Sequence, residues 1–228
     1  MTIRALLFAA MFPVLLVLSW VYRKDKLEPE PGHLLLKLFL LGVVSAIPAI
    51  LLEIVMSIPI STISRHTLWA FADTFAGVAL VEELCKFVFL MIGSWRSREF
   101  NYRFDGIVYA VFVSLGFAAL ENILYVFQLG LGVAVSRALL SIPGHAVFAV
   151  FMGTFYSIAR GRANRKEGGC VPMLALGLVT AILFHGFYDF CLTAEIPVLY
   201  YAFFAYAVLA DVAAILLVRR KSKNDAPV

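Results

Sequence analysis

Apolar residues dominate long stretches of the chain, and short polar segments separate them. A helix of about 20 residues crosses the roughly 30 Å hydrocarbon core of a bilayer. Seven stretches reach this length, namely residues 3–21, 35–58, 70–93, 106–128, 137–159, 172–193 and 197–218. The pattern predicts an all-α, polytopic transmembrane helix bundle of seven spans. Because the polar connections are short, we expect residues 1–228 to form a single integral membrane domain.

The composition supports this fold class, with 62% hydrophobic and 15% charged residues. The basic residues gather in alternate connections and at the end of the chain, at Arg23, Lys24, Lys26, Lys37, Arg96, Arg98, Arg103, Arg160, Arg162, Arg165, Lys166, Arg219, Arg220, Lys221 and Lys223. By the positive-inside rule, the N-terminus is expected outside and the C-terminus in the cytoplasm, where residues 219–228 form a basic tail. The net charge of +4 therefore reflects orientation in the cell membrane. We expect the lipid bilayer as a partner and no nucleic acid.

Three charged residues interrupt the stretch 70–93, at Glu82, Glu83 and Lys86. Each charge costs about 2.5 to 3.5 kcal/mol at the centre of a membrane helix, whereas each strongly apolar residue contributes only about 0.3 to 0.6 kcal/mol. The three side chains must therefore face the bundle interior or a wet cavity, where ionisable residues usually serve function. The alternative is a structural ion pair between Glu82 and Lys86, which lie four residues apart on one helix face.

Titratable residues occur in the next three stretches as well: Glu121, His145, His185 and Asp189. Counted along each helix from its predicted outer end, all of them fall in the outer half of the membrane, at a depth similar to that of the glutamates. Each has a plain alternative, because a lone buried histidine is often a hydrogen-bonded packing residue. Their joint depth predicts one shared site.

Such a site could hydrolyse a peptide bond, which requires a base to activate water, donors for the oxyanion and an acid for the leaving amine. This chemistry requires no cofactor. A zinc site is also possible, since carboxylates and imidazoles are zinc ligands, although the H-E-x-x-H motif of zinc proteases is absent. The main alternative is a proton-coupled or metal-ion transporter that uses the same residues as a relay. No internal repeat of the kind found in many transporters is evident.

Four motifs occur in order, each in its own stretch: VEELCKF (81–87), GFAALENILY (116–125), GHAVFAVFMG (144–153) and HGFYDF (185–190). This series resembles the PrsW family of intramembrane proteases over about residues 70–195, which would then be the catalytic helices. That family is similar to the glutamate-dependent group that includes the CAAX prenyl protease. In that group, histidine stands at the position of Glu121 and arginine takes the place of Lys86.

The resemblance implies roles for six residues. Glu82 would be the leading candidate for general base with Glu83 beside it, Glu121 would help to hold the water, His185 and Asp189 would hold the oxyanion, and His145 would complete the pocket. It also implies cleavage of a single-pass membrane protein, such as an anti-sigma factor, on its extracytoplasmic side.

Two further polar residues lie at helix ends. Arg137 is expected at the outer mouth of the site, either as a contact for substrate or backbone or as an interfacial residue whose charge reaches the water. Asp105 precedes an apolar stretch and is expected to be a helix N-cap.

Overall fold

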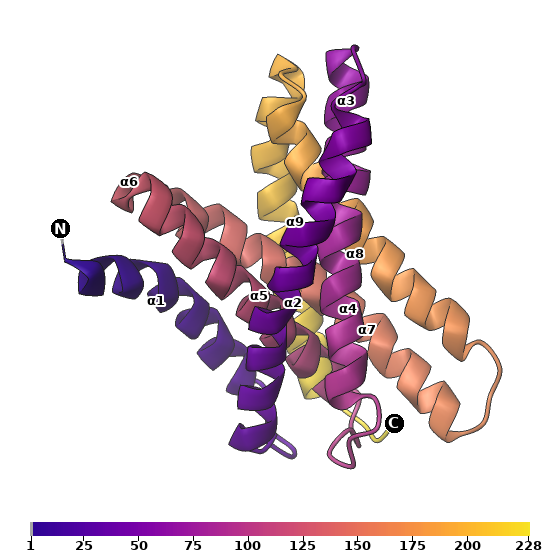
Figure 1. The fold of residues 1–228 in the computed structure, drawn as a ribbon. Helices are drawn as coiled ribbons and strands as arrows, with labels where there is room; N and C mark the ends of the chain where they lie inside the picture. Colours follow the sequence, from indigo (N-terminus) through magenta and orange to yellow (C-terminus); the bar gives the residue numbers. More distant parts are fainter. Residues whose placement is uncertain (1) are drawn as a thin grey trace.

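A computed structural model describes residues 2–228 and consists almost entirely of helices (Figure 1). In chain order these are α1 (Ile3–Tyr22), α2 (Gly32–Ile60), α3 (His66–Ala72), the π-helical segment η1 (Asp73–Ala79), α4 (Leu80–Ser94), α5 (Asp105–Leu129), α6 (Leu131–Ser136), the π-helical segment η2 (Arg137–Ser141), α7 (Ile142–Asn164), α8 (Cys170–Thr193) and α9 (Pro197–Lys223). Since α3, η1 and α4 follow one another without a break, as do α6, η2 and α7, the described residues trace seven helical paths. The predicted all-α bundle is confirmed.

Six of these paths are long and apolar enough to cross a membrane. The remaining path, from His66 to Ser94, corresponds to the predicted stretch 70–93. It differs from the others by its charged residues, Asp73, Glu82, Glu83 and Lys86, and it contains the π-helical segment η1 ahead of α4. Thr74 donates a hydrogen bond from Oγ1 to the Ala70 carbonyl at 2.8 Å across the junction. π-helical turns of this kind occur frequently at functional sites.

Helix α5 lies at the centre of the bundle and packs against α1, α2 and α7. Small residues permit these contacts, because a Cβ atom on Gly153 of α7 would collide with the Gly106 carbonyl of α5. Helix α8 packs against α7 and η1. The elements that carry the predicted site residues are thus held directly against one another.

The connections at one end of the bundle meet the C-terminal segment (Figure 1). The predicted basic tail is helical as far as Lys223, and the last residues form an isolated antiparallel bridge between Pro227 and Tyr102. The N-cap prediction for Asp105 is wrong. Its carboxylate instead accepts hydrogen bonds from the preceding amides of Asn101 and Tyr102, which shape the α4–α5 connection.

Candidate active site

Helix α4 turns Glu82, Glu83 and Lys86 into the bundle, where all three are buried. The Lys86 ammonium donates to Glu82 Oε2 and to Glu83 Oε1, in each case at 2.8 Å. The Glu82–Lys86 ion pair considered from the sequence therefore exists. It is only part of the arrangement, because the same ammonium also pairs with Glu83. The side chain of Lys86 lies against the Phe117 ring, with Nζ 4.2 Å from its centroid.

His145 of α7 continues this network. Its Nδ1 lies 3.1 Å from Lys86 Nζ, and its Nε2 lies 2.9 Å from Glu121 Oε2 on α5. An ammonium has three protons to donate and accepts none, so the Nδ1 of His145 must be the acceptor. His145 is therefore assigned as the neutral tautomer that donates from Nε2 to Glu121.

His185 of α8 lies between two carboxylates. Its Nδ1 is 2.9 Å from Glu83 Oε1, and its Nε2 is 3.2 Å from Asp189 Oδ2 one turn later. A ring with an acceptor at each nitrogen is satisfied best as an imidazolium, which has two N–H donors. The Phe148 ring stacks on His185, with centroids 4.8 Å apart, and holds it in this orientation.

Arg137 at the start of η2 is partly exposed and belongs to the same polar network. Its Nη2 forms an ion pair with Glu121 Oε2 at 3.0 Å, and its Nε donates to Asn122 Oδ1 at 2.9 Å. Asn122, which is fully buried, donates in turn to the Ala10 carbonyl of α1 at 2.7 Å. A continuous chain of polar contacts thus joins α1 to the buried glutamates.

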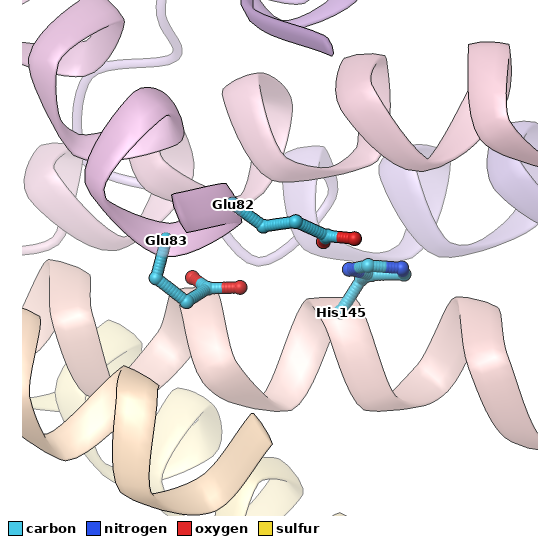
Figure 2. Close-up of side chains that lie close together, drawn as sticks. All are labelled: Glu82, Glu83 and His145. Carbon is cyan, nitrogen blue, oxygen red and sulfur yellow. The ribbon is translucent and has the colours of Figure 1, made fainter. Parts of the chain in front are cut away.

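The structure brings together all six residues singled out from the sequence: Glu82, Glu83, Glu121, His145, His185 and Asp189. Figure 2 shows the carboxylates of Glu82 and Glu83 and the ring of His145 directed toward a common point between α4 and α7. Five of the six line a cavity of about 670 Å³, which we call the charged cavity. Glu83 is the exception, since it is 1% exposed and does not line the cavity.

Two acidic residues of the charged cavity escaped the sequence analysis. Glu53 of α2 and Asp73 of η1 both line it. Glu53 carried a usable signal, because it is a charged residue inside the apolar stretch 35–58. Asp73 lies near the predicted start of its span, where a carboxylate resembles an ordinary helix-end residue.

Comparison with known proteins identifies the family. The sequence profile of the PrsW family intramembrane metalloprotease matches residues 30–217. Protease PrsW of Bacillus subtilis (strain 168) is 38% identical over 199 residues, which cover 86% of this chain and 87% of that protein. Protease PrsW of Shouchella clausii (strain KSM-K16) is 30% identical over 219 residues, covering 96% and 98% of the two chains. No solved structure gives a significant match.

The family description implies a metal ion, and the side chains can be tested for one. Glu82, Glu83 and His145 present ligand atoms within 4.8 Å of one another, and their types suit zinc. The Lys86 ammonium, however, lies within hydrogen-bond distance of all three side chains. A metal ion bound by these three side chains would have to displace Lys86. The arrangement therefore fits the ammonium and not a metal ion.

The fold, the buried polar site and the comparisons agree on one class of protein. The apolar helices make the chain a multi-pass protein of the cell membrane. The named relatives are proteases, which decides between the two functions suggested by the sequence in favour of a membrane peptidase over a transporter. The chain belongs to the PrsW family of intramembrane metalloproteases.

Proposed function

We propose that this peptidase hydrolyses a peptide bond of a single-pass membrane protein with a water molecule that Glu82 activates. The observation that carries the proposal is the different placement of the two adjacent glutamates. Glu82 lines the charged cavity and contacts Lys86, whereas Glu83 is enclosed between Lys86 and His185. A general base must reach its water, and Glu82 meets this requirement better than Glu83.

Glu83 acts through its neighbours in this mechanism. It accepts from Lys86 and from His185, so it fixes the positions of both cations. The Lys86 ammonium lies 2.8 Å from Glu82 Oε2 and offsets the negative charge that a base carries. Glu83 is therefore a positioning residue, and its loss would disturb Lys86 and His185 together.

The proton and the developing charge have defined destinations. Glu82 takes a proton from water as the oxygen attacks the scissile carbonyl, and it then delivers that proton to the leaving amine. The positively charged ring of His185, whose two N–H groups are held by Glu83 and Asp189, stabilises the carbonyl oxygen electrostatically as that oxygen becomes negative. Glu121, oriented by His145 and Arg137, accepts a hydrogen bond from the attacking water.

We propose that Lys86 supplies the positive charge that a metal ion would supply in a metalloprotease. It contacts the two glutamates and His145, and it is almost completely buried. Catalysis would then survive removal of metal ions. This part of the proposal is separate from the identity of the base and is tested by a separate measurement.

The substrate follows from the position of the charged cavity. A membrane-embedded family acts on membrane proteins, and the basic connections predict that the cavity opens toward the extracytoplasmic side. A single-pass protein such as an anti-sigma factor, cut near its extracytoplasmic boundary, suits this geometry.

The test uses purified full-length protein in liposomes with tagged single-pass substrates, including an anti-sigma factor. We expect Glu82→Gln to lower the cleavage rate by about 10²-fold or more, because it removes the base while preserving size. Glu167→Gln is the matched control, since this glutamate is exposed on the α7–α8 connection. Cleavage at the wild-type rate by Glu82→Gln would exclude Glu82 as the base.

A chelator series tests the role of Lys86. We expect the wild type to retain its rate after treatment with a zinc chelator and dialysis. A loss of activity that added zinc restores would overturn the metal-independent mechanism, and it would leave the peptidase assignment intact.

A further inference from the structure

A second group of carboxylates, two of them buried and one half-buried, lies at the other end of the bundle. Asp25 of the α1–α2 connection, Asp105 at the start of α5 and Asp225 after α9 present ligand atoms within 4.8 Å of one another, and we call them the acidic cluster. Asp105 precedes Glu121 by sixteen residues on one continuous helix, which separates the acidic cluster from the charged cavity by about 24 Å. The two groups are therefore distinct sites.

Backbone amides already fix each carboxylate of the acidic cluster. Asp25 Oδ2 accepts from Glu30 N at 3.2 Å, and Asp225 Oδ1 accepts from Phe104 N at 2.9 Å. Asp105 Oδ2 accepts from two amides of the α4–α5 connection. The three side chains are thus preorganised, although they belong to segments far apart in the sequence.

Among the described residues, three buried oxygens at this place have no hydrogen-bond partner: Oδ1 of Asp105, Oε2 of Glu30 and the hydroxyl of Tyr109. Asp105 is 1% exposed and Glu30 is 4% exposed, and Tyr109 lies beside Glu30. Burial and the charge of Asp105 raise the pKa of Glu30 to about 9, which places Glu30 beside the acidic cluster. A buried polar atom without a partner is rare and costly, and a bound ion is one way in which a protein satisfies such an atom.

Basic side chains offset these charges only from beyond ion-pair distance, as the charge of Arg103 does for Asp225. Among residues 2–228, none of the ion pairs within 4.0 Å involves Asp25, Glu30, Asp105 or Asp225. Carboxylates gathered in this way repel one another unless a proton or a cation lies between them. Ca²⁺ binds carboxylate oxygens at about 2.3 to 2.6 Å, so oxygens up to about 4.8 Å apart can share one ion.

We propose that Asp25, Asp105 and Asp225, with Glu30 beside them, form a binding site for a hard divalent cation such as Ca²⁺ or Mg²⁺. The ion ties the α1–α2 connection and the C-terminal segment to the start of α5. These segments are already in contact, because Val228 N donates to the Asn101 carbonyl at 2.9 Å and Ser222 Oγ donates to the Lys24 carbonyl. The ion thus closes the end of the bundle from which α5 runs toward the charged cavity.

The experiment measures thermal unfolding of the full-length protein in neutral detergent after chelator treatment. We expect millimolar CaCl₂ or MgCl₂ to raise the Tm by about 4 °C or more relative to NaCl of equal ionic strength. Asp105→Asn should abolish the rise, since asparagine can still accept from the Asn101 and Tyr102 amides but carries no charge. Asp225→Asn provides a second variant should the first fold poorly.

Two controls separate this site from other effects. Glu28→Gln removes an exposed carboxylate of the same connection, which bonds to Asn101 but lies outside the cluster, and it should keep the full rise. Glu82→Gln should also keep the full rise in Tm, because Glu82 is not part of the acidic cluster. If the ion bound in the charged cavity instead, this variant would remove one of its ligands and the rise would be smaller. Equal Tm in chelator and in both cations, or a rise that Asp105→Asn and Asp225→Asn both retain, would overturn the proposal.

Limited proteolysis gives a local measure. Trypsin cleavage after Lys223 should be about tenfold slower with the cation than with chelator in the wild type, and equal in the two conditions in Asp225→Asn. Equal rates for the wild type would contradict an ion that holds the C-terminal segment.

Discussion

At the charged cavity, Glu82, which lines it, and the enclosed Glu83 share the Lys86 ammonium. In the acidic cluster, Asp25, Asp105 and Asp225 form no ion pair within 4.0 Å with any basic side chain of residues 2–228. Both places bury acidic groups, so both carry a desolvation cost that an opposite charge must offset. In the cavity the counter-charge is covalently part of α4 and cannot leave. In the cluster it must come from solution, as a proton or a cation.

The source of the counter-charge in each region agrees with the position of that region in the bundle. The cavity lies among apolar helices, where an uncompensated charge is most expensive, and its contacts extend without interruption from Asn122 through Arg137, Glu121 and His145 to Lys86. The cluster lies where polar connections meet, so ions can reach it from water. An internal cation thus gives a permanent site, and an external one gives a site that conditions can regulate.

The largest effect is expected from Lys86→Met. This change removes the internal cation, so that the charged cavity, like the acidic cluster, has buried carboxylates without a lysine partner. It leaves buried Glu82 without its 2.8 Å ion pair and Glu83 with His185 alone, so we expect a loss of stability of about 3 to 5 kcal/mol and loss of cleavage. Denaturant unfolding and the liposome assay measure these effects, and Lys166→Met on the exposed α7–α8 connection is the control. Zinc content measured after dialysis should rise in Lys86→Met alone, because Glu82, Glu83 and His145 are then free to bind metal. Wild-type stability in this variant would show that Lys86 is not the required counter-charge.

A smaller effect is expected from Arg137→Gln, which removes a cation from the partly exposed edge of the network. The Glu121 side chain is 23% exposed and keeps its bond to His145, so water replaces part of the lost ion pair. We expect kcat to fall about tenfold, with a loss of stability of about 1 kcal/mol. The matched Arg65→Gln, at an exposed position before α3, should change neither quantity. An Arg137→Gln variant as damaged as Lys86→Met would mean that the two cations act as one unit.

The smallest effect, and one of opposite sign, is expected from Glu30→Gln at the cluster. In chelator, this change should raise stability by about 0.5 kcal/mol, because burial raises the pKa of Glu30 to about 9 and folding must then bind a proton that glutamine does not require. Unfolding in chelator measures this change, with Glu28→Gln as the control. A loss of stability in chelator would show that a basic group of the chain already neutralises Glu30. The acidic cluster would then have an internal counter-charge, as the charged cavity does.

The arrangement of helices could be predicted closely because burial in a membrane imposes a simple length and polarity rule. Predicted and observed bounds differ by a few residues for α1 and α8. Two features escaped that rule. The π-helical turn at Asp73–Ala79 leaves no mark in the hydropathy pattern, and the helical continuation of α9 to Lys223 depends on contacts with the α1–α2 connection.

The sequence alone determined that the chain spans the membrane. It also indicated that acidic residues and histidines of four stretches meet, since ionisable side chains in apolar helices face the bundle interior and pair with one another. Only the tertiary structure decided which glutamate faces the cavity, that Lys86 contacts three partners, and that Asp25, Asp105 and Asp225 converge. The reason is geometric. Helical spacing fixes which residues share a face of one helix, but the rotation of each helix and the path of each connection are set by packing against the others.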